Sequence, residues 1–392
     1  MQSVRLKRQG RRLSVLFHAQ ERRPTQLPKN LKTLERDAFR GCTGLTSVLI
    51  PKTVENTHYY YDGIYSPFRG CNNLQEVKFE DGMTRIPNSI LCFCAAKLNI
   101  VIPDSVTEIG EAAFLNSGIV AVTIPDTVTE IEEDAFRGCT GLTDIKLPDS
   151  VVNIGTKIFA NCTSLTDVTL PNAWELIPAS TFEGCTALEK LVLPESVQYI
   201  RDGAFKNCTA LKEIVWSKAP ELIDSNAFYN CDAITEMDIP ATVTSVGYQA
   251  FYDCDGLTKI TIPDGVTSLG DSVFYDCDAL ADVKLGAGIT TIPASAFRHC
   301  DALEQLTVPR RVTAIKDNAF KDSVKFSSIT IPRSVTSISA NAFSYLDKLT
   351  IYGVAGTYAE TFPNTNSIKF VDRQVSATSA SPDQTAPPPN KG

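Results

Sequence analysis

The chain has 392 residues, of which 43% are hydrophobic and 21% are charged, and its net charge at pH 7 is −8. These proportions are typical of a water-soluble folded protein, and the chain has no apolar run long enough to cross a membrane. Residues 1–23 carry a net charge of +6, so the remainder carries −14. Such an acidic body disfavours contact with a phosphate backbone, and we expect no nucleic-acid partner.

The first 26 residues form a basic segment for which we expect little order. The apolar stretch at residues 13–17 is interrupted by Ser14 and is shorter than the roughly 7–15 residues of a secretory signal core. We therefore expect no signal peptide in this chain, and the sequence by itself leaves the localisation open.

Residues 27–352 contain about fourteen copies of a unit that is 23 residues long. The clearest marker is a large apolar anchor that recurs at this interval in nine consecutive steps. Repeats of this length stack side by side and need no single large core. The anchors are Phe39, Phe68, Leu91, Phe114, Phe136, Phe159, Phe182, Phe205, Phe228, Phe251, Phe274, Phe297, Phe320 and Phe343.

Each column of the unit has a physical interpretation, which the stretch IEEDAFRGCTGLTDIKLP at residues 131–148 illustrates. Ala directly before the anchor predicts a short helical turn. The column two residues after the anchor holds Gly, Asn or Asp, which tolerate the left-handed conformation and predict the end of that turn. Next comes a strand with the pattern Leu-x-x-Ile-x-Leu, which Pro ends.

This order of strand, turn, short helix and turn predicts an α/β repeat solenoid. We expect a leucine-rich-repeat right-handed superhelix, with a parallel sheet on its concave face and short helical turns and loops on the other. A parallel β-helix is the competing architecture, and the helix-ending column favours the leucine-rich repeat.

Residues 257–277, LTKITIPDGVTSLGDSVFYDC, closely resemble the BspA-like, or treponemal-type, leucine-rich repeat. Residues 351–370 resemble the cap that closes such arrays, so we place a C-terminal cap at residues 353–371. Members of this family are commonly bacterial or protist surface proteins that adhere to host proteins or to other cells. The resemblance thus implies a cell-surface or secreted adhesion protein.

Eleven of the twelve cysteines occupy a single column, three residues after the anchor, and Cys92 alone lies off it. Ser117 and Ser323 fill the same column in two units. The side chains of such a column are parallel, which does not suit the dihedral angle of a disulfide. We expect free, buried thiols that pack as small hydrophobic groups.

No residues stand at the spacing of a known catalytic or metal site. The three histidines are widely separated, and neither a G-x-S-x-G motif, a phosphate-binding loop nor a zinc motif occurs. We predict no catalytic residues, no metal ligands and no cofactor, and hence no enzyme.

Two sets of residues are candidates for binding a partner. The first is an acidic stripe of exposed strand residues on the concave face, whose alternative interpretation is a solvated sheet surface. The second is a tyrosine-rich insertion, which could equally be a structural bulge. The stripe is Glu76, Asp144, Asp167, Glu213, Glu236 and Asp282, and the insertion tyrosines are Tyr59, Tyr60, Tyr61 and Tyr65.

Residues 372–392 are rich in Pro, Ser and Thr and predict a disordered tail. The whole pattern predicts a monomeric, non-catalytic protein-binding solenoid. The family resemblance implies that it adheres to a partner, with host and extracellular-matrix proteins as candidates. An intracellular leucine-rich-repeat scaffold or sensor is the alternative, and a carbohydrate-active β-helix enzyme is a more distant one.

Overall fold

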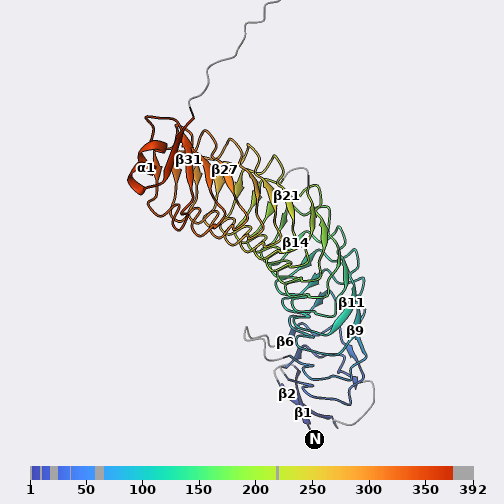
Figure 1. Cartoon of the computed structure of the whole chain (residues 1–392). Coiled ribbons are helices and arrows are strands. Elements are labelled where there is room, and N and C mark those ends of the chain that lie inside the picture. The colour runs from blue at the N-terminus through green and yellow to red at the C-terminus, as the bar shows by residue number, and fades with distance from the viewer. Residues whose placement is uncertain are drawn as a thin grey trace, which may run out of the picture.

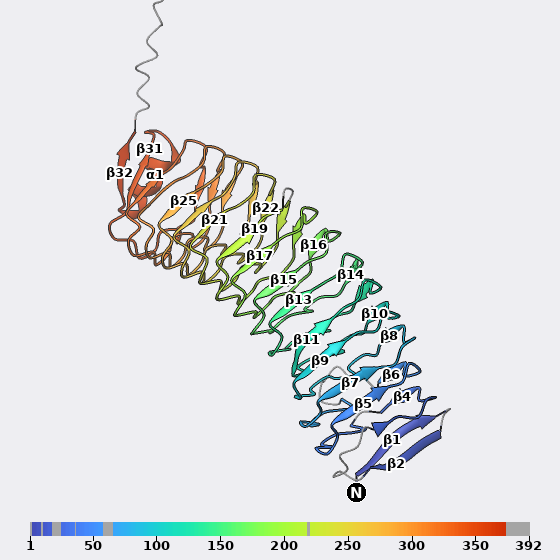
Figure 2. The same ribbon diagram turned by 90° about the vertical axis from the view of Figure 1, so that its right-hand side faces the viewer.

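The computed structural model describes residues 2–8, 11–17, 25–35, 37–57, 66–217 and 220–373. These residues form an elongated, curved solenoid in which each repeat unit makes one coil (Figure 1). Two stacks of parallel strands run along it, one of longer and one of shorter strands (Figure 2). Neighbouring coils are thus joined by hydrogen bonds at several points of their circumference, as in a stacked repeat protein.

The longer strands form from the Leu-x-x-Ile-x-Leu segment. Their side chains alternate, so that in β13 (Asp144–Lys146) Ile145 is buried while Asp144 and Lys146 are exposed. The strands of this stack are β3 (Thr25–Gln26), β5 (Ser47–Ile50), β7 (Glu76–Phe79), β9 (Leu98–Val101), β11 (Ile119–Thr123), β13, β15 (Asp167–Thr169), β17 (Lys190–Val192), β19 (Glu213–Val215), β21 (Glu236–Asp238), β23 (Lys259–Thr261), β25 (Asp282–Lys284), β27 (Gln305–Thr307), β29 (Ser328–Thr330) and β31 (Thr350–Gly353). We call their exposed side the long-strand face.

A second stack, which the sequence analysis did not predict, follows the proline turn. It contains the aliphatic column five residues before the anchor, as in the pairing of Ile109 with Ile131 and of Ile131 with Ile154. The shorter strands are β4 (Thr33–Leu34), β6 (Asn56–Thr57), β8 (Arg85–Ile86), β10 (Glu108–Ile109), β12 (Glu130–Ile131), β14 (Asn153–Ile154), β16 (Leu176–Ile177), β18 (Tyr199–Ile200), β20 (Leu222–Ile223), β22 (Ser245–Val246), β24 (Ser268–Leu269), β26 (Thr291–Ile292), β28 (Ala314–Ile315) and β30 (Ser337–Ile338).

The anchor lies in a series of turns, and the short helix expected there is not formed. Two left-handed residues flank it, as at Asp134 and Gly138 around Phe136, where φ is 59° and 69°. An α-helix cannot continue through a left-handed residue, so consecutive turns form instead. The N–H groups of Asp134, Phe136 and Gly138 donate to carbonyls of the next coil at 3.1, 3.0 and 2.7 Å. The left-handed column after the anchor, by contrast, is confirmed.

The anchors form stacks of rings through the core, on either side of Leu91. Phe136, Phe205 and Phe274 are 0% exposed, and so is Leu91, which replaces Phe in one coil. Stacked neighbouring anchor rings have centroids 5.1–5.8 Å apart. Since each ring covers the next, every interior coil stabilises both of its neighbours.

The cysteine column lies beside this ring stack, and all twelve cysteines are free and buried. The thiols pack as predicted, and they also form hydrogen bonds. In the regular part of the array, each thiol donates a hydrogen bond to the backbone carbonyl of an anchor. Cys162 Sγ, for example, donates to Phe136 O at 3.2 Å. Ser323 Oγ donates to Phe297 O at 2.6 Å in the same position. This shared hydrogen bond explains why Ser can stand in a Cys column.

Different elements cover the two ends of the array. At the start, β1 (Gln2–Arg8) pairs antiparallel with β2 (Arg11–Phe17) and with β4. At the other end, α1 (Tyr358–Asn366) precedes β32 (Lys369–Asp372), which pairs with β31. Phe362 of α1 packs edge-on against the last anchor, Phe343, at a centroid distance of 6.0 Å. The helix therefore shields the open end of the ring stack from water.

Candidate protein-binding surfaces

The structure brings the six acidic residues of the predicted stripe into one column. Each is the first residue of its long strand, and each is exposed. Asp144 and Asp167 are direct partners in the parallel pairing of β13 with β15. The arrangement follows from the repeat length, because equivalent residues of neighbouring coils lie side by side in register.

Neighbouring lysines neutralise half of this column. Lys190 lies 2.8 Å from Glu213, and Lys259 lies 3.7 Å from Glu236, each from an adjacent coil. Lys78 lies 2.6 Å from Glu76 within one strand. In the part of the chain that the structure describes, the three aspartates form no ion pair. Within the predicted stripe, the acidic character is therefore concentrated at Asp144, Asp167 and Asp282.

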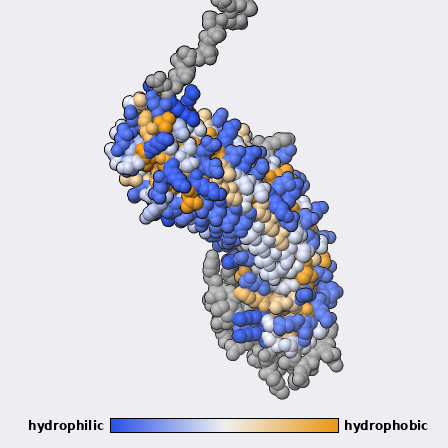
Figure 3. All heavy atoms as spheres, in the orientation of Figure 1, coloured by the Kyte–Doolittle hydropathy of each residue, from blue (hydrophilic) through white to orange (hydrophobic). Residues whose placement is uncertain are grey.

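The long-strand face also carries exposed apolar side chains. Val101 is 64% exposed and Val192 is 56% exposed. Leu49 and Val101 line a shallow groove of about 620 Å³ together with Glu76 and Lys78. Figure 3 shows that, on the side in view, hydrophobic residues form small separate patches among hydrophilic ones. Mixed apolar and charged side chains of this kind are typical of protein-binding surfaces.

The second predicted set, Tyr59, Tyr60, Tyr61 and Tyr65, lies outside the described residues. Ser66 and Pro67, which follow it, are buried as the chain enters the turn of Phe68. The tyrosine insertion stays a prediction.

A further surface on the turns of the anchors was missed by the sequence analysis. Tyr229, Tyr252 and Tyr275 each follow an anchor directly, and their rings stack with centroids 4.7 and 4.8 Å apart. Rows of aspartates lie beside them in the same turns. We define the Tyr–Asp edge as Tyr229, Tyr252, Tyr275, Asp232, Asp253, Asp255, Asp276, Asp278 and Asp301. The recurring sequences FYNCD and FYDCD were the signal that could have identified it.

Three aspartates of the Tyr–Asp edge, Asp232, Asp253 and Asp278, have a raised pKa. Partial burial and then the negative charge of Asp255 raise the pKa of Asp253, and the same two causes act on Asp232. Burial and the neighbouring tyrosines raise the pKa of Tyr252 to about 12. Within the described residues, none of the six aspartates of the edge forms an ion pair. The edge is therefore a patch with an excess of negative charge at neutral pH.

We expect the substitution Asp253→Asn to stabilise the protein slightly at pH 7. It removes a repelled charge, and Asn tolerates the φ of 57° found there, as Asn230 does in the preceding coil. The expected gain in the free energy of unfolding is at most about 0.5 kcal/mol, since the site is largely solvated. Thermal unfolding of parent and variant measures it.

The pH dependence provides the control for this variant. A raised carboxyl pKa contributes stability while the carboxyl is protonated, and this contribution is lost as the pH rises through the folded-state pKa. The parent should therefore lack the contribution at pH 7 and regain it near pH 3, where the difference from the variant should vanish. A difference that persists unchanged at pH 3 would contradict the electrostatic cause.

Glu108 of β10 and Glu132, which directly follows β12, form a pair of carboxylates that can be compared with the catalytic pairs of some enzymes, whose two carboxyl groups have separated pKa values. Burial and a hydrogen bond with Glu132 raise the pKa of Glu108. Burial raises the pKa of Glu132, but hydrogen bonds with Glu108 and Arg85 outweigh this effect, so that its pKa is lowered. Arg85 contacts both carboxylates, at 2.8 and 2.7 Å. The guanidinium of Arg85 thus forms an ion pair with each of the two carboxylates, and we interpret this cluster as structural.

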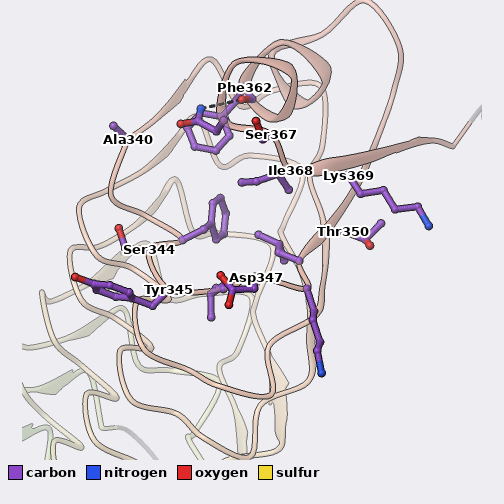
Figure 4. A pocket seen from close by; sticks show the side chains of 14 residues that line it. Ala340, Ser344, Tyr345, Asp347, Thr350, Phe362, Ser367, Ile368 and Lys369 are labelled. Atoms are coloured by element: carbon purple, nitrogen blue, oxygen red, sulfur yellow. Dashed lines mark hydrogen bonds between the residues drawn. The ribbon is translucent and has the colours of Figure 1, made fainter.

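The end of the array contains a cavity of about 600 Å³ between the last coil and the cap (Figure 4). Phe343, Leu346 and Phe362 contribute its apolar lining, and Asp347 and Lys369 are among its charged residues. No histidine or cysteine lines it. None of the predicted site residues lies there.

Two searches for other kinds of site found nothing in the described ranges. No group of three or more His, Cys, Asp or Glu side chains there could hold a metal ion. No helix there has the length and apolar character that a membrane crossing requires.

Comparison with known proteins identifies similar chains. A family model described as BspA type leucine rich repeat region matches in six copies, over residues 15–141, 107–232 and 221–350. A leucine-rich repeat protein from Bacteroides ovatus is 24% identical with a TM-score of 0.67, covering 92% of this chain and 94% of its own. No curated protein matches the chain.

Two further solved structures share the fold over most of their length. A leucine rich cell surface protein from Faecalibacterium prausnitzii is 25% identical with a TM-score of 0.50, covering 88% of this chain and 90% of its own. The pneumococcal vaccine antigen PcpA is 18% identical with a TM-score of 0.53, covering 90% and 94%. The predicted leucine-rich-repeat solenoid is therefore confirmed.

Proposed function

The chain belongs to the BspA-type leucine-rich repeat family, and we propose that it is a non-catalytic adhesion protein that binds a partner protein through its long-strand face. The observation that carries this proposal is the chemistry of that face. Aspartates without an ion pair among the described residues, paired charges and exposed aliphatic side chains form an ordered surface on a rigid stack of strands. Ordered surfaces of this kind bind partners without a large loss of conformational entropy.

Cell-surface localisation is part of the same proposal. The structural relative from Faecalibacterium prausnitzii is described as a cell surface protein. The resemblance of the repeats to adhesive surface proteins points the same way. We therefore propose host and extracellular-matrix proteins as the class of partner.

The proposal is tested by measuring binding to a panel of immobilised extracellular-matrix and cell-surface proteins. The variant Asp144→Asn, Asp167→Asn, Asp282→Asn removes the charges of the three stripe residues that form no ion pair within the described part of the chain. Glu213 and Glu236 are left unchanged, because their charge is already offset by lysines. We expect the dissociation constant for the bound protein to rise about tenfold, with a strong dependence on ionic strength.

A matched control removes three charges elsewhere. Asp104→Asn, Asp126→Asn and Glu175→Gln alter exposed residues outside the long-strand face and should leave the affinity unchanged. Equal loss of binding in both variants would indicate a general effect of net charge. Absence of binding to every protein of the panel would remove the support for adhesion.

A further inference from the structure

The Tyr–Asp edge contains aspartates that the fold itself does not need. In the column four residues after the anchor, four consecutive coils carry threonine and the next four carry aspartate. The backbone follows the same turn in both halves of the array. The threonines are Thr140, Thr163, Thr186 and Thr209, and the aspartates are Asp232, Asp255, Asp278 and Asp301.

This exchange of threonine for aspartate has an electrostatic cost. Equivalent residues of adjacent coils lie side by side, so each added aspartate repels its neighbours above and below. Asp232 receives a hydrogen bond from the backbone N–H of Asp255, but no cation in the described residues pairs with it. A threonine in this position would avoid the repulsion. Local features that oppose stability in this way are expected where a surface has a binding role.

The tyrosines beside the aspartates form a flat, preorganised strip. Their rings are nearly parallel, with interplanar angles of 4° and 6°. Lys206 lies 4.9 Å from the ring centroid of Tyr229, and the Arg298 guanidinium lies 5.2 Å from that of Tyr275. The ring faces are therefore covered, and the half-buried rings present edges and hydroxyl groups to the solvent.

We propose that the Tyr–Asp edge binds an extended, lysine- and arginine-rich segment of a partner protein. The aliphatic part of a lysine or arginine side chain packs along the ring edges, while its cationic head reaches a carboxylate. The tyrosines and aspartates supply both halves of this contact within one turn of each of the three coils that contain a tyrosine. The site lies on the anchor turns and does not depend on the long-strand face.

The spacing of the coils specifies the sequence of the segment further. Two steps of the tyrosine stack, of 4.7 and 4.8 Å, connect Tyr229 to Tyr275. Three residues of an extended chain cover a similar length of about 10 Å. A cation at every third residue would therefore meet a carboxylate at every second coil.

The probe for this site is a fluorescently labelled twelve-residue peptide of lysine-serine-serine repeats, measured by fluorescence anisotropy at two salt concentrations. The test variant is Asp232→Thr, Asp255→Thr, Asp278→Thr, Asp301→Thr, which restores the residue of the preceding coils. We expect at least about a tenfold loss of affinity for the peptide. The thermal midpoint should stay the same or rise, because the like-charge repulsion is removed.

A control variant that loses the same number of charges distinguishes an effect of the Tyr–Asp edge from an effect of the net charge of the molecule. Asp144→Asn, Asp167→Asn, Asp238→Asn and Asp282→Asn remove four carboxylates from the long-strand face and should leave peptide affinity unchanged. The substitution Tyr252→Ala tests the aromatic strip and should weaken binding about threefold at the higher salt concentration.

Two results would overturn the proposal. One is equal affinity of the peptide for the threonine variant and the parent protein. The other is an equal loss of affinity in the threonine variant and in the long-strand control. Because the two sites lie on different faces, failure of the peptide to bind leaves the result with matrix proteins unaffected.

Discussion

Raising the pH from 7 to 10 is expected to remove at least about 11 kcal/mol from the free energy of unfolding, which is comparable with the whole stability of many domains. The cause is the cysteine column. Burial raises the pKa of Cys139 to about 12 and that of Cys254 to about 12. Cys162, Cys185, Cys208, Cys231, Cys277 and Cys300 are shifted in the same direction.

The sign follows from the two states of the thiol. In the folded protein these thiols stay protonated, whereas in the unfolded chain they ionise near the ordinary value of 9.0. The stabilising contribution is complete below the unfolded-state pKa and is lost as the pH rises toward the folded-state pKa. Each buried thiol loses about 1.4 kcal/mol for one pH unit above the unfolded-state value. Denaturant unfolding in a reducing buffer at pH 7, 8, 9 and 10 measures the effect.

The chain itself suggests the matched variant for this experiment. Ser117 and Ser323 occupy the cysteine column naturally, and Ser323 Oγ donates to an anchor carbonyl as the thiols do. Replacing Cys162, Cys185, Cys208 and Cys231 by Ser should therefore reduce the loss of stability between pH 7 and pH 10 by about 6 kcal/mol, at about 1.4 kcal/mol for each thiol. An identical loss in parent and variant would show that other groups cause the alkaline unfolding.

The second large effect is expected from the ring stack. Phe228 is 0% exposed and stacks on Phe205 and Phe251 with centroid distances of 5.3 Å on both sides. Phe228→Ala removes one ring and leaves a cavity between two coils, which should cost about 3–5 kcal/mol of the free energy of unfolding. Guanidinium unfolding measures the loss, and hydrogen exchange should locate it in the coils of Phe205, Phe228 and Phe251.

Leu91 provides the control, because it fills the anchor position of its own coil with 0% exposure. Phe228→Leu keeps most of the buried volume and should cost less than half as much as the alanine variant. Equal losses for the two variants would contradict a volume effect. Equal losses would instead indicate that the stability comes from the aromatic contact between the rings.

Much of the fold follows from residues that repeat at intervals of 23. The anchors, the left-handed column and the cysteine column could be assigned from residue type alone, because each column has one dominant chemistry. Gly138 and Asn161 show this well, since both have the left-handed φ that their residue types predict. The helical turn was wrongly predicted because Ala-Phe has helical propensity. The residue two positions before the anchor is also left-handed, but its residue type, such as Lys157, does not indicate this conformation.

The binding surfaces could be predicted only in part. The acidic stripe was identifiable as a column, and its exposure follows from strand alternation. The neutralisation of part of its charge by lysines could not be predicted, since Lys190 and Glu213 are 23 residues apart and meet only when the coils stack. The same is true of the stacked rings of Tyr229 and Tyr252.

The sequence by itself determined the repeat length, the buried columns and the family, because these depend on the character of individual side chains and their interval. Only the tertiary structure decided which charges remain unpaired, how the thiols are bonded and where tyrosines and aspartates meet. The physical reason is that stacking converts a separation of 23 residues into direct contact, as between Asp144 and Asp167. Interactions between coils therefore depend on how the side chains of neighbouring units pack, and the residue types of a column do not by themselves reveal them.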